Sequence, residues 1–427
     1  MIFCSGKQEH RLKWAFESCK NGAWGSEPDG EADVICIRAA DFDGQSGRLN
    51  EGERTLRAID PAVFEKIALR PGDLVMEKSG GGEKQLVGRT ALFDDDRPSV
   101  TSNFLARCRP ASGIDPAYLN YLMLAIYTGR GTYPHIKQST GIQNLDLGRY
   151  LDMRVSIPEL LAQQRIARFL DDKTARIDAL IEKKQALQER LAEKRQALIT
   201  RAVTKGLNPD VPMKPSGVDW LGDIPSHWDL LQLRRVTRKV TTGRTPPSAL
   251  ADYFTDGDVN WFTPGDFGDG IELCDSERKI SSTAIDDGVA SLYPSGTVFL
   301  VAIGATLGKV AIAKEPGSAN QQVNAMIMKD RNSPQFLAYF LEGFRNEVRM
   351  TSNGNTLAIL NQDGTKALMV LRPPVEEQEA ISEFLIGQDQ RDSIVIGEVE
   401  RSCQLLAEYR AALVTAAVTG QLPELNG

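Results

Sequence analysis

Residues 158–207 read PELLAQQRIARFLDDKTARIDALIEKKQALQERLAEKRQALITRAVTKGL and form one uninterrupted helical pattern. Good helix formers dominate this stretch, and neither Gly nor Pro occurs between Pro158 and Gly206. Apolar residues recur at steps of three, four and seven, which is typical of a coiled-coil seam. The seam consists of Ile166, Leu170, Ile177, Leu180, Leu187, Leu191 and Leu198. At about 1.5 Å per residue the pattern predicts a rod of about 65 to 70 Å, which suits a spacer or a dimerisation strut.

The same pattern returns 215 residues later in the chain. Pro158 corresponds to Pro373, and Gln163 corresponds to Gln378. The second seam consists of Ile381, Leu385, Val395, Val399, Leu406, Tyr409 and Leu413. A repeat of this length predicts that the whole chain is built from two similar halves.

Each long helix follows a segment in which short strands and short helices alternate. Residues 34–37 and 259–262 read as equivalent strands, and Pro116 and Pro334 open equivalent helices. The sequence therefore predicts a mixed α+β fold (α/β in the broad sense) with two globular units. The boundaries that we expect are 1–157 for the first unit, 158–206 for its helix, 207–218 for a Pro- and Gly-rich linker, 219–372 for the second unit and 373–422 for its helix.

Size and composition limit the classes of protein that fit. The 427 residues are too many for one core, and no stretch approaches the 18 apolar residues of a membrane span, so we expect a soluble, cytoplasmic protein. Its six cysteines and three histidines lack metal-ligand spacing, which favours reduced thiols and no bound metal. The net charge of −7 argues against a strongly cationic nucleic-acid binder, although cations cluster at residues 97–149 and 234–244.

Catalytic motifs are weak throughout the sequence. Residues 304–309 resemble a phosphate-binding loop only superficially, because Val310 stands where Ser or Thr would hold magnesium. A metal-dependent nuclease using Glu277 and Lys279 with Asp258 or Asp266 remains the alternative hypothesis. We expect no catalytic residue in this chain.

Two pairs of segments resemble those of a known family, the specificity subunits of type I restriction-modification systems. One is the stretch from Asp219 to Trp228 together with residues 304–310, and the other is the pair of helix starts at residues 157–167 and 373–381. The resemblance covers essentially the full chain, but the Trp-Leu-Gly-Asp-Ile-Pro lead-in of the second half has no counterpart before Leu12. That departure leaves open a shortened first unit or a late start of the reading frame.

The resemblance implies a non-catalytic subunit that reads a bipartite DNA target. Each globular unit would be a target recognition domain for one half-site, and the two long helices would pack antiparallel and separate the units with pseudo-two-fold symmetry. The implied partners are double-stranded DNA, two methyltransferase subunits and restriction (translocase) subunits, with no membrane. S-adenosylmethionine, ATP and Mg²⁺ would be bound by those partner subunits, and this chain would hold no cofactor.

Base reading needs polar and cationic side chains on loops that reach base edges or phosphates. In the first unit the candidates are Lys78, Ser79, Arg89, Tyr133, Lys137, Gln138, Thr140 and Gln143. In the second unit they are Thr242, Arg244, Thr245, Lys309, Asn320, Gln321, Gln322, Asn324, Asn353 and Asn355. For each residue taken alone, an exposed loop side chain without a role in DNA binding is the alternative.

Overall fold

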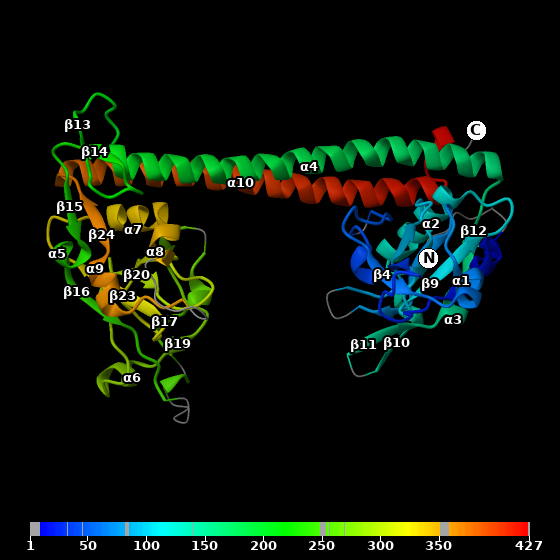
Figure 1. Cartoon of the computed structure of the whole chain (residues 1–427), viewed down its shortest axis with the longest axis horizontal. Helices are drawn as coiled ribbons and strands as arrows, with labels where there is room; N and C mark the ends of the chain where they lie inside the picture. The colour runs from blue at the N-terminus through cyan, green and yellow to red at the C-terminus, as the bar shows by residue number, and fades with distance from the viewer. Residues whose placement is uncertain are drawn as a thin grey trace. The chain divides into compact units, whose positions relative to one another are not determined.

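The computed structural model describes residues 9–31, 33–44, 46–81, 85–139, 141–247, 253–255, 257–268, 270–350 and 358–425. Three of the candidate base readers, Thr140, Asn353 and Asn355, lie outside the described residues. The chain divides into two compact units (Figure 1). Unit 1 comprises residues 1–184 and 400–427, and unit 2 comprises residues 185–399.

Unit 1 is built from short strands and three short helices, followed by the first part of a long helix. The strands are β1 (Glu9–Arg11), β2 (Phe16–Asn21), β3 (Asp33–Ile37), β4 (Thr55–Ala58), β5 (Leu74–Glu77), β6 (Ser79–Gly80), β7 (Thr90–Leu92), β8 (Ser99–Thr101), β9 (Leu105–Pro110), β10 (Ile136–Ser139), β11 (Ile142–Leu145) and β12 (Arg154–Ser156). The helices are α1 (Pro61–Ile67), α2 (Pro116–Thr128), α3 (Leu147–Leu151) and α4 (Leu160–Lys205).

The strands of unit 1 form several small sheets. The largest has the order β2-β9-β5-β7, and a second has the order β4-β3-β8, in which only the β3–β8 pair is parallel. Helix α2 starts at Pro116, where the Asp115 carboxylate accepts a hydrogen bond from Tyr118 N. Because α2 is apolar on all sides, it lies buried against the β2-β9-β5-β7 sheet, α4 and the end of α10 (Val375–Val418).

Unit 2 repeats this plan with larger sheets. Its strands are β13 (Met213–Pro215), β14 (Asp223–Pro225), β15 (Asp229–Gln232), β16 (Thr237–Thr242), β17 (Val259–Phe262), β18 (Glu272–Leu273), β19 (Lys279–Ile280), β20 (Val298–Val301), β21 (Val310–Ala313), β22 (Gly317–Ala319), β23 (Val323–Met328) and β24 (Met369–Arg372). Its short helices are α5 (Leu233–Val236), α6 (Ser282–Asp286), α7 (Pro334–Gly343), α8 (Arg345–Met350) and α9 (Gln362–Ala367). The main sheet has the order β16-β23-β20-β21-β18, and β19-β17-β22 forms a second sheet.

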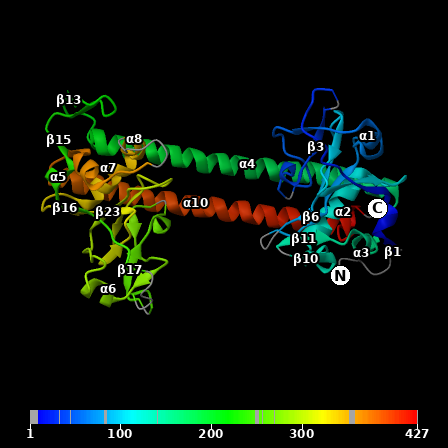
Figure 2. The ribbon, with the colours of Figure 1, turned by 60° about the horizontal axis from the view of Figure 1, so that its bottom comes forward.

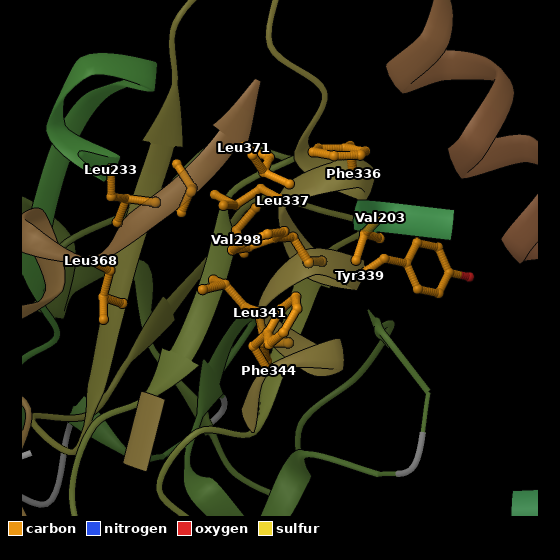
Figure 3. Packing of buried hydrophobic residues seen from close by; sticks show 14 of the residues in the cluster. Val203, Leu233, Val298, Phe336, Leu337, Tyr339, Leu341, Phe344, Leu368 and Leu371 are labelled. Carbon is orange, nitrogen blue, oxygen red and sulfur yellow. The ribbon is translucent and has the colours of Figure 1, made fainter. Parts of the chain in front are cut away.

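The core of unit 2 lies between α7, the main sheet and the ends of the long helices. Figure 3 shows Phe336 and Leu337 of α7 beside Val298 of the sheet, with Val203 of α4 next to Tyr339. Strand β17 and helix α6 lie at the end of unit 2 that is remote from its α4 segment, in both views (Figures 1 and 2). Strand β17 and helix α6 pack in hydrophobic clusters separate from the one that contains the ends of the long helices.

The internal repeat extends to individual hydrogen bonds. In unit 1, Gln163 accepts a hydrogen bond from Asp115 N at 2.8 Å through Oε1 and donates to Pro158 O at 2.8 Å through Nε2. In unit 2, Gln378 accepts from Ser333 N at 2.8 Å and donates to Pro373 O at 2.7 Å. One buried glutamine thus ties the start of each long helix to the start of the apolar helix that it covers.

The long helices α4 and α10 run antiparallel within each unit. In unit 1 the Arg410 guanidinium binds Asp178 at 2.8 Å, and in unit 2 Arg195 binds Asp389 at 2.8 Å. The mixed α+β class with two long helices that the sequence predicts is therefore confirmed. In the part of the chain that the structure describes, no helix has the length and apolar character needed to cross a bilayer.

Only part of the expected helix seam is buried. Ile166, Leu170 and Ile177 are buried in unit 1, and Ile381 and Leu385 are buried in unit 2. Val399 is buried, while Leu191, Leu198, Leu406 and Leu413 are half-buried. Leu180, Leu187, Val395 and Tyr409 are exposed, at 43%, 43%, 40% and 59%. These four do not form the buried seam that the spacing predicts, because two helices alone leave the outer side of a wide apolar stripe uncovered.

Candidate nucleic-acid interface

The turn between β5 and β6 carries two of the candidates in unit 1. Lys78 donates through Nζ to Asn21 Oδ1 at 2.7 Å, and burial lowers the pKa of its amine. The Ser79 hydroxyl donates to Asn144 Oδ1 at 2.7 Å. Gly80 follows at φ 134°, a conformation that other residues rarely adopt. The turn is therefore fixed in place, with Lys78 half-buried at its edge.

The β10–β11 hairpin carries the next group, and β11 pairs with β6, so both groups lie on one small sheet. Tyr133 is 61% exposed just before the hairpin, with the Arg130 guanidinium 5.4 Å from the centre of its ring. Lys137 forms an exposed ion pair with Asp146 at 2.8 Å, and Gln138 is exposed. In both ribbon views this hairpin lies at the end of unit 1 that is remote from α4 (Figures 1 and 2).

Two candidates of unit 1 lie in the interior instead. Gln143 is buried, and its Oε1 accepts a hydrogen bond from Val87 N at 3.0 Å. Arg89 forms an ion pair at 3.2 Å with the buried carboxylate of Glu77. Both side chains therefore order the loops beside the hairpin, and the structure does not place them where a base edge could reach them.

In unit 2, the end of β16 meets the turn between β22 and β23. The Thr245 hydroxyl is hydrogen-bonded to Gln321 Oε1, and both residues are exposed. Asn320 donates to Gln322 Oε1 at 3.1 Å and accepts from Gln322 N at 3.0 Å. Arg244 is exposed and reaches Gly288 O at 3.2 Å. This cluster of Arg244, Thr245, Gln321 and Gln322 presents a cation, a hydroxyl and two amides on one edge of the unit.

Asn324 is a correction to the candidate set, because it is only 1% exposed. Its Nδ2 donates to Leu360 O at 2.9 Å and to Thr365 Oγ1 at 2.8 Å. Its Oδ1 accepts from the Thr242 hydroxyl at 2.8 Å. Asn324 and Thr242 are thus engaged with each other and with the loop before α9, and they hold the scaffold rather than reach outward.

Lys309 is half-buried, and it donates through Nζ to Phe267 O at 2.8 Å. The preceding loop turns at Gly304 and Gly308, whose φ angles are 95° and 92°. The lysine of this loop therefore ties together two segments of unit 2, and its amine does not point into a phosphate-sized cradle of backbone N–H groups. The superficial resemblance to a phosphate-binding loop has no structural counterpart.

The acidic residues of the nuclease hypothesis have structural roles. Asp266 accepts hydrogen bonds from Thr263 N at 2.7 Å and from Glu277 N at 2.7 Å. Asp258 accepts from Ser282 N at 3.1 Å, at the start of α6. Among the described residues no group of three or more His, Cys, Asp or Glu side chains could hold a metal ion. The nuclease hypothesis is therefore not supported.

Comparison with known proteins identifies the family of this chain. A sequence model described as the type I restriction modification DNA specificity domain matches residues 72–189 and 225–394, which is more than half of the chain. The chain belongs to this family. The two matched segments of the DNA specificity domain fall one in each half of the repeat.

Several specificity subunits are related to this chain in sequence. The type I restriction enzyme MjaIX specificity subunit of Methanocaldococcus jannaschii is 30% identical over 169 residues, which are 39% of this chain and 38% of that protein. The EcoprrI specificity subunit of Escherichia coli is 28% identical over 142 residues, 32% of this chain and 35% of that protein. The chain thus spans little more than a third of the length of these two relatives. A putative MjaX specificity subunit of M. jannaschii matches over 84% of this chain and 80% of its own length at 22% identity.

Two solved structures share the fold of this chain. One comes from a study of complex assembly and conformational transition of the type I R-M system; it has a TM-score of 0.68 at 18% identity and covers 98% of this chain and 99% of its own. The other is the HsdS subunit from Thermoanaerobacter tengcongensis, with a TM-score of 0.52 at 17% identity and 98% of each chain covered. At these identities the likeness is one of fold.

Proposed function

We propose that this chain is the DNA sequence-recognition subunit of a type I restriction-modification complex and reads a bipartite target. The observation that carries the proposal is the contrast within the repeat. Gln163 and Gln378 make the same two hydrogen bonds in the two units, and Arg195 and Arg410 each bind an aspartate of the other long helix. The loops differ, because the turn after β8 reads Ser102-Asn103-Phe104 and the turn after β22 reads Asn320-Gln321-Gln322. Two copies of one scaffold with different loops suit two different half-sites.

The exposed loop residues have the chemistry that base reading requires. In unit 1 these are Tyr133 just before the hairpin and Lys137 and Gln138 on it; in unit 2 they are Arg244, Thr245 and Gln321, with the half-buried Gln322 beside them. Arg and Lys suit guanine, and amides suit adenine, whose edges in the major groove differ in donors and acceptors. We infer that these residues contact DNA, while Arg89, Gln143, Thr242, Lys309 and Asn324 support the loops from behind.

The domain boundaries follow from the same proposal. Residues 1–157 and 219–372 would be the two target recognition domains, and 207–218 would be the linker between them. Residues 158–206 and 373–422 would be the helices that set the gap between half-sites. Apolar side chains left exposed on those helices, such as Leu161 at 72% and Ile394 at 64%, would meet methyltransferase subunits.

The chain itself would not be catalytic in this assembly. Adenine methylation and ATP-driven cleavage would belong to partner subunits, which would bind S-adenosylmethionine, ATP and Mg²⁺. The net charge of −7 agrees with a subunit that shares DNA binding with partners rather than clasping DNA alone.

Co-expression with a methyltransferase subunit of a type I system, sought first in the neighbouring gene, tests the proposal. A genome-wide map of methylated adenines should give a split motif with a fixed gap, and the motif should disappear when this chain is omitted. Co-purification without any sequence-specific methylation would contradict the recognition role. A lack of association between the two proteins would contradict the scaffolding role.

A further inference from the structure

The turn that carries Gln321 and Gln322 in unit 2 has a counterpart in unit 1, which contains none of the candidate base-reading residues. In unit 2 the turn joins β22 to β23, and Val323 N donates to Asn320 O at 3.2 Å. In unit 1 the turn joins β8 to β9, and Leu105 N donates to Ser102 O at 3.0 Å. Both turns follow a strand that pairs in parallel with a central neighbour, β17 or β3. The two turns therefore occupy the same place in the fold.

Hydrogen bonds from neighbouring strands align the two turns residue by residue. Ser102 N donates to Ile37 O at 2.9 Å, and Asn320 N donates to Phe262 O at 3.0 Å. Two residues further on, the carbonyl of Phe104 accepts from the residue that follows β5, and the carbonyl of Gln322 accepts from the residue that follows β20. These bonds are Lys78 N to Phe104 O at 2.9 Å and Ala302 N to Gln322 O at 2.8 Å. Phe104 thus occupies in unit 1 the position that Gln322 occupies in unit 2.

A glycine holds each turn against the end of the neighbouring strand. A Cβ on Gly22 would lie 1.9 Å from Thr101 O, and a Cβ on Gly243 would lie 2.3 Å from Ala319 O and from Asn320 O. No other residue type fits such an approach of two backbones. Both turns are therefore fixed in position, so the direction of their exposed side chains is set by the scaffold.

The side chain of Phe104 is exposed, as is that of Asn103, between the buried residues Ser102 and Leu105. Phe104 is 50% exposed, whereas Ser102 and Leu105 are 2% and 0% exposed. The Phe104 carbonyl also accepts from Ser79 N at 3.1 Å, so the backbone of Phe104 lies beside the turn that carries Lys78 and Ser79. A single exposed apolar side chain is common on a protein surface. Phe104 is singled out by its place, because its turn corresponds to the one that carries Gln321 and Gln322 and lies beside the turn that carries Lys78 and Ser79.

We propose that Phe104 is a specificity-determining residue of unit 1 and contacts the 5-methyl group of a thymine in the half-site that this unit reads. This assignment rests on the proposed DNA-recognition function. A phenyl ring cannot hydrogen-bond a base edge, and the thymine methyl is the one apolar group that distinguishes base pairs in the major groove. Gln322, at the equivalent position of unit 2, reads its base through an amide instead.

Replacement of thymine by deoxyuridine tests the contact, because it removes only the methyl group. The full chain, assembled with its methyltransferase subunits, is titrated with duplexes that carry the mapped target. Each thymine of one half-site is replaced in turn. One replacement should weaken binding by the wild-type protein by about fourfold, which is the effect of one buried methyl group. The Phe104→Ala variant should bind both duplexes equally, and Phe104→Leu should keep part of the difference.

Gln322→Ala is the matched control at the equivalent position of the other unit. It should leave the deoxyuridine effect unchanged and alter recognition only in the other half-site. Phe104→Gln should change the methylated motif at one position of the first half-site and nowhere else. Since half of the ring is buried, Phe104→Ala should lower the thermal unfolding midpoint by only a few degrees. A much larger fall would indicate misfolding, which separates a recognition effect from loss of the fold.

The outcomes separate the two levels of the proposal. Wild-type complexes that bind no specific duplex would overturn the recognition function itself. Wild-type complexes that bind the mapped target but tolerate every deoxyuridine, or a Phe104→Ala variant that loses equal affinity for both duplexes, would overturn the thymine contact alone. An equal loss of affinity for both duplexes in Phe104→Ala would instead indicate that the ring inserts between bases.

Discussion

The guanidinium of Arg195 donates from Nε and Nη2 to the two carboxylate oxygens of Asp389, at 2.8 and 2.9 Å. The pair joins α4 to α10 within unit 2, and both side chains are about four-fifths buried, at 19% and 20% exposure. Tyr339 of α7 donates to the same carboxylate at 3.0 Å, so the pair also fixes the globular part of unit 2 to the long helices. In unit 1, Arg410 has the equivalent role with Asp178.

Replacing Arg195 by alanine should therefore destabilise unit 2. The substitution leaves a mostly buried carboxylate with one hydrogen bond, and we expect a loss of about 2 kcal/mol. Urea denaturation followed by circular dichroism measures it, with Arg190→Ala on the exposed side of the same helix as the control. Arg410→Ala should cost less, because Asp178 is 44% exposed. Equal midpoints for the Arg195→Ala and Arg190→Ala variants would contradict the role assigned to the pair.

Asn324 and Gln321 should behave in opposite ways when each is changed to alanine. Loss of the buried Asn324 amide leaves Leu360 O and the Thr242 and Thr365 hydroxyls without this partner, at a cost of about 2 to 3 kcal/mol in the stability of unit 2. Gln321→Ala should alter stability by less than about 0.5 kcal/mol and change the base preference in one half-site. Thermal melts and methylation maps of both variants test this contrast. A destabilised Gln321→Ala variant with an unchanged motif would refute it.

His135 should make the β10–β11 hairpin sensitive to pH. Burial, and to a lesser extent Arg149, lower the pKa of His135 below 6.5, while Asp146 opposes the shift. Because the folded state disfavours the protonated ring, the full stability is present above pH 6.5 and falls as the pH drops through the folded pKa. Proton exchange of the hairpin amides, corrected for intrinsic rates, should show more opening at pH 5.5 than at pH 7.5. In a His135→Asn variant, opening should depend much less on pH; an unchanged dependence would assign the effect to another group.

The spacing of half-sites should follow the length of the long helices. Inserting one helical turn near Leu191, with a matching insertion in α10 near Asp392, lengthens the pair by about 5 Å. The permitted gap in the methylated motif should then increase by one or two base pairs, since about 34 Å of duplex holds about ten base pairs. Both half-sites should stay the same. A methylation map with an unchanged gap would exclude the helices as the determinant of spacing.

Much of the fold could be predicted because its signals are periodic. The seam from Ile166 to Leu198 predicted a helix that the structure places at Leu160–Lys205, and the Asp-Pro and Ser-Pro starts predicted α2 and α7. The strand expected at residues 34–37 is β3, at Asp33–Ile37. These patterns depend on residues close in sequence, so they can be recognised without tertiary information.

The orientation of single polar side chains could not be predicted in the same way. Asn324 lies on β23 between Val323 and Ala325, and all three are buried, so the strand offers no alternation that would show which side faces solvent. The inward orientation of Gln143 could not be predicted either, because the backbone N–H that it binds belongs to Val87, 56 residues away in the sequence. Phe104 was missed because a lone aromatic residue next to a strand is typical of a core, and only the folded structure shows that it is exposed and that it corresponds to Gln322.

In each globular unit an early strand pairs with the last strand before the long helix. β1 pairs with β12 in unit 1, and β15, which follows the β13–β14 pair, pairs with β24 in unit 2, so the segments between these strands start and end at neighbouring points next to the long helix. A unit attached in this way behaves as a cassette, since everything between the two paired strands can be replaced without redirecting the rest of the chain. On the proposed function, recombination between genes at these two strands would exchange the reading of one half-site in a single event and leave the other half-site as it was.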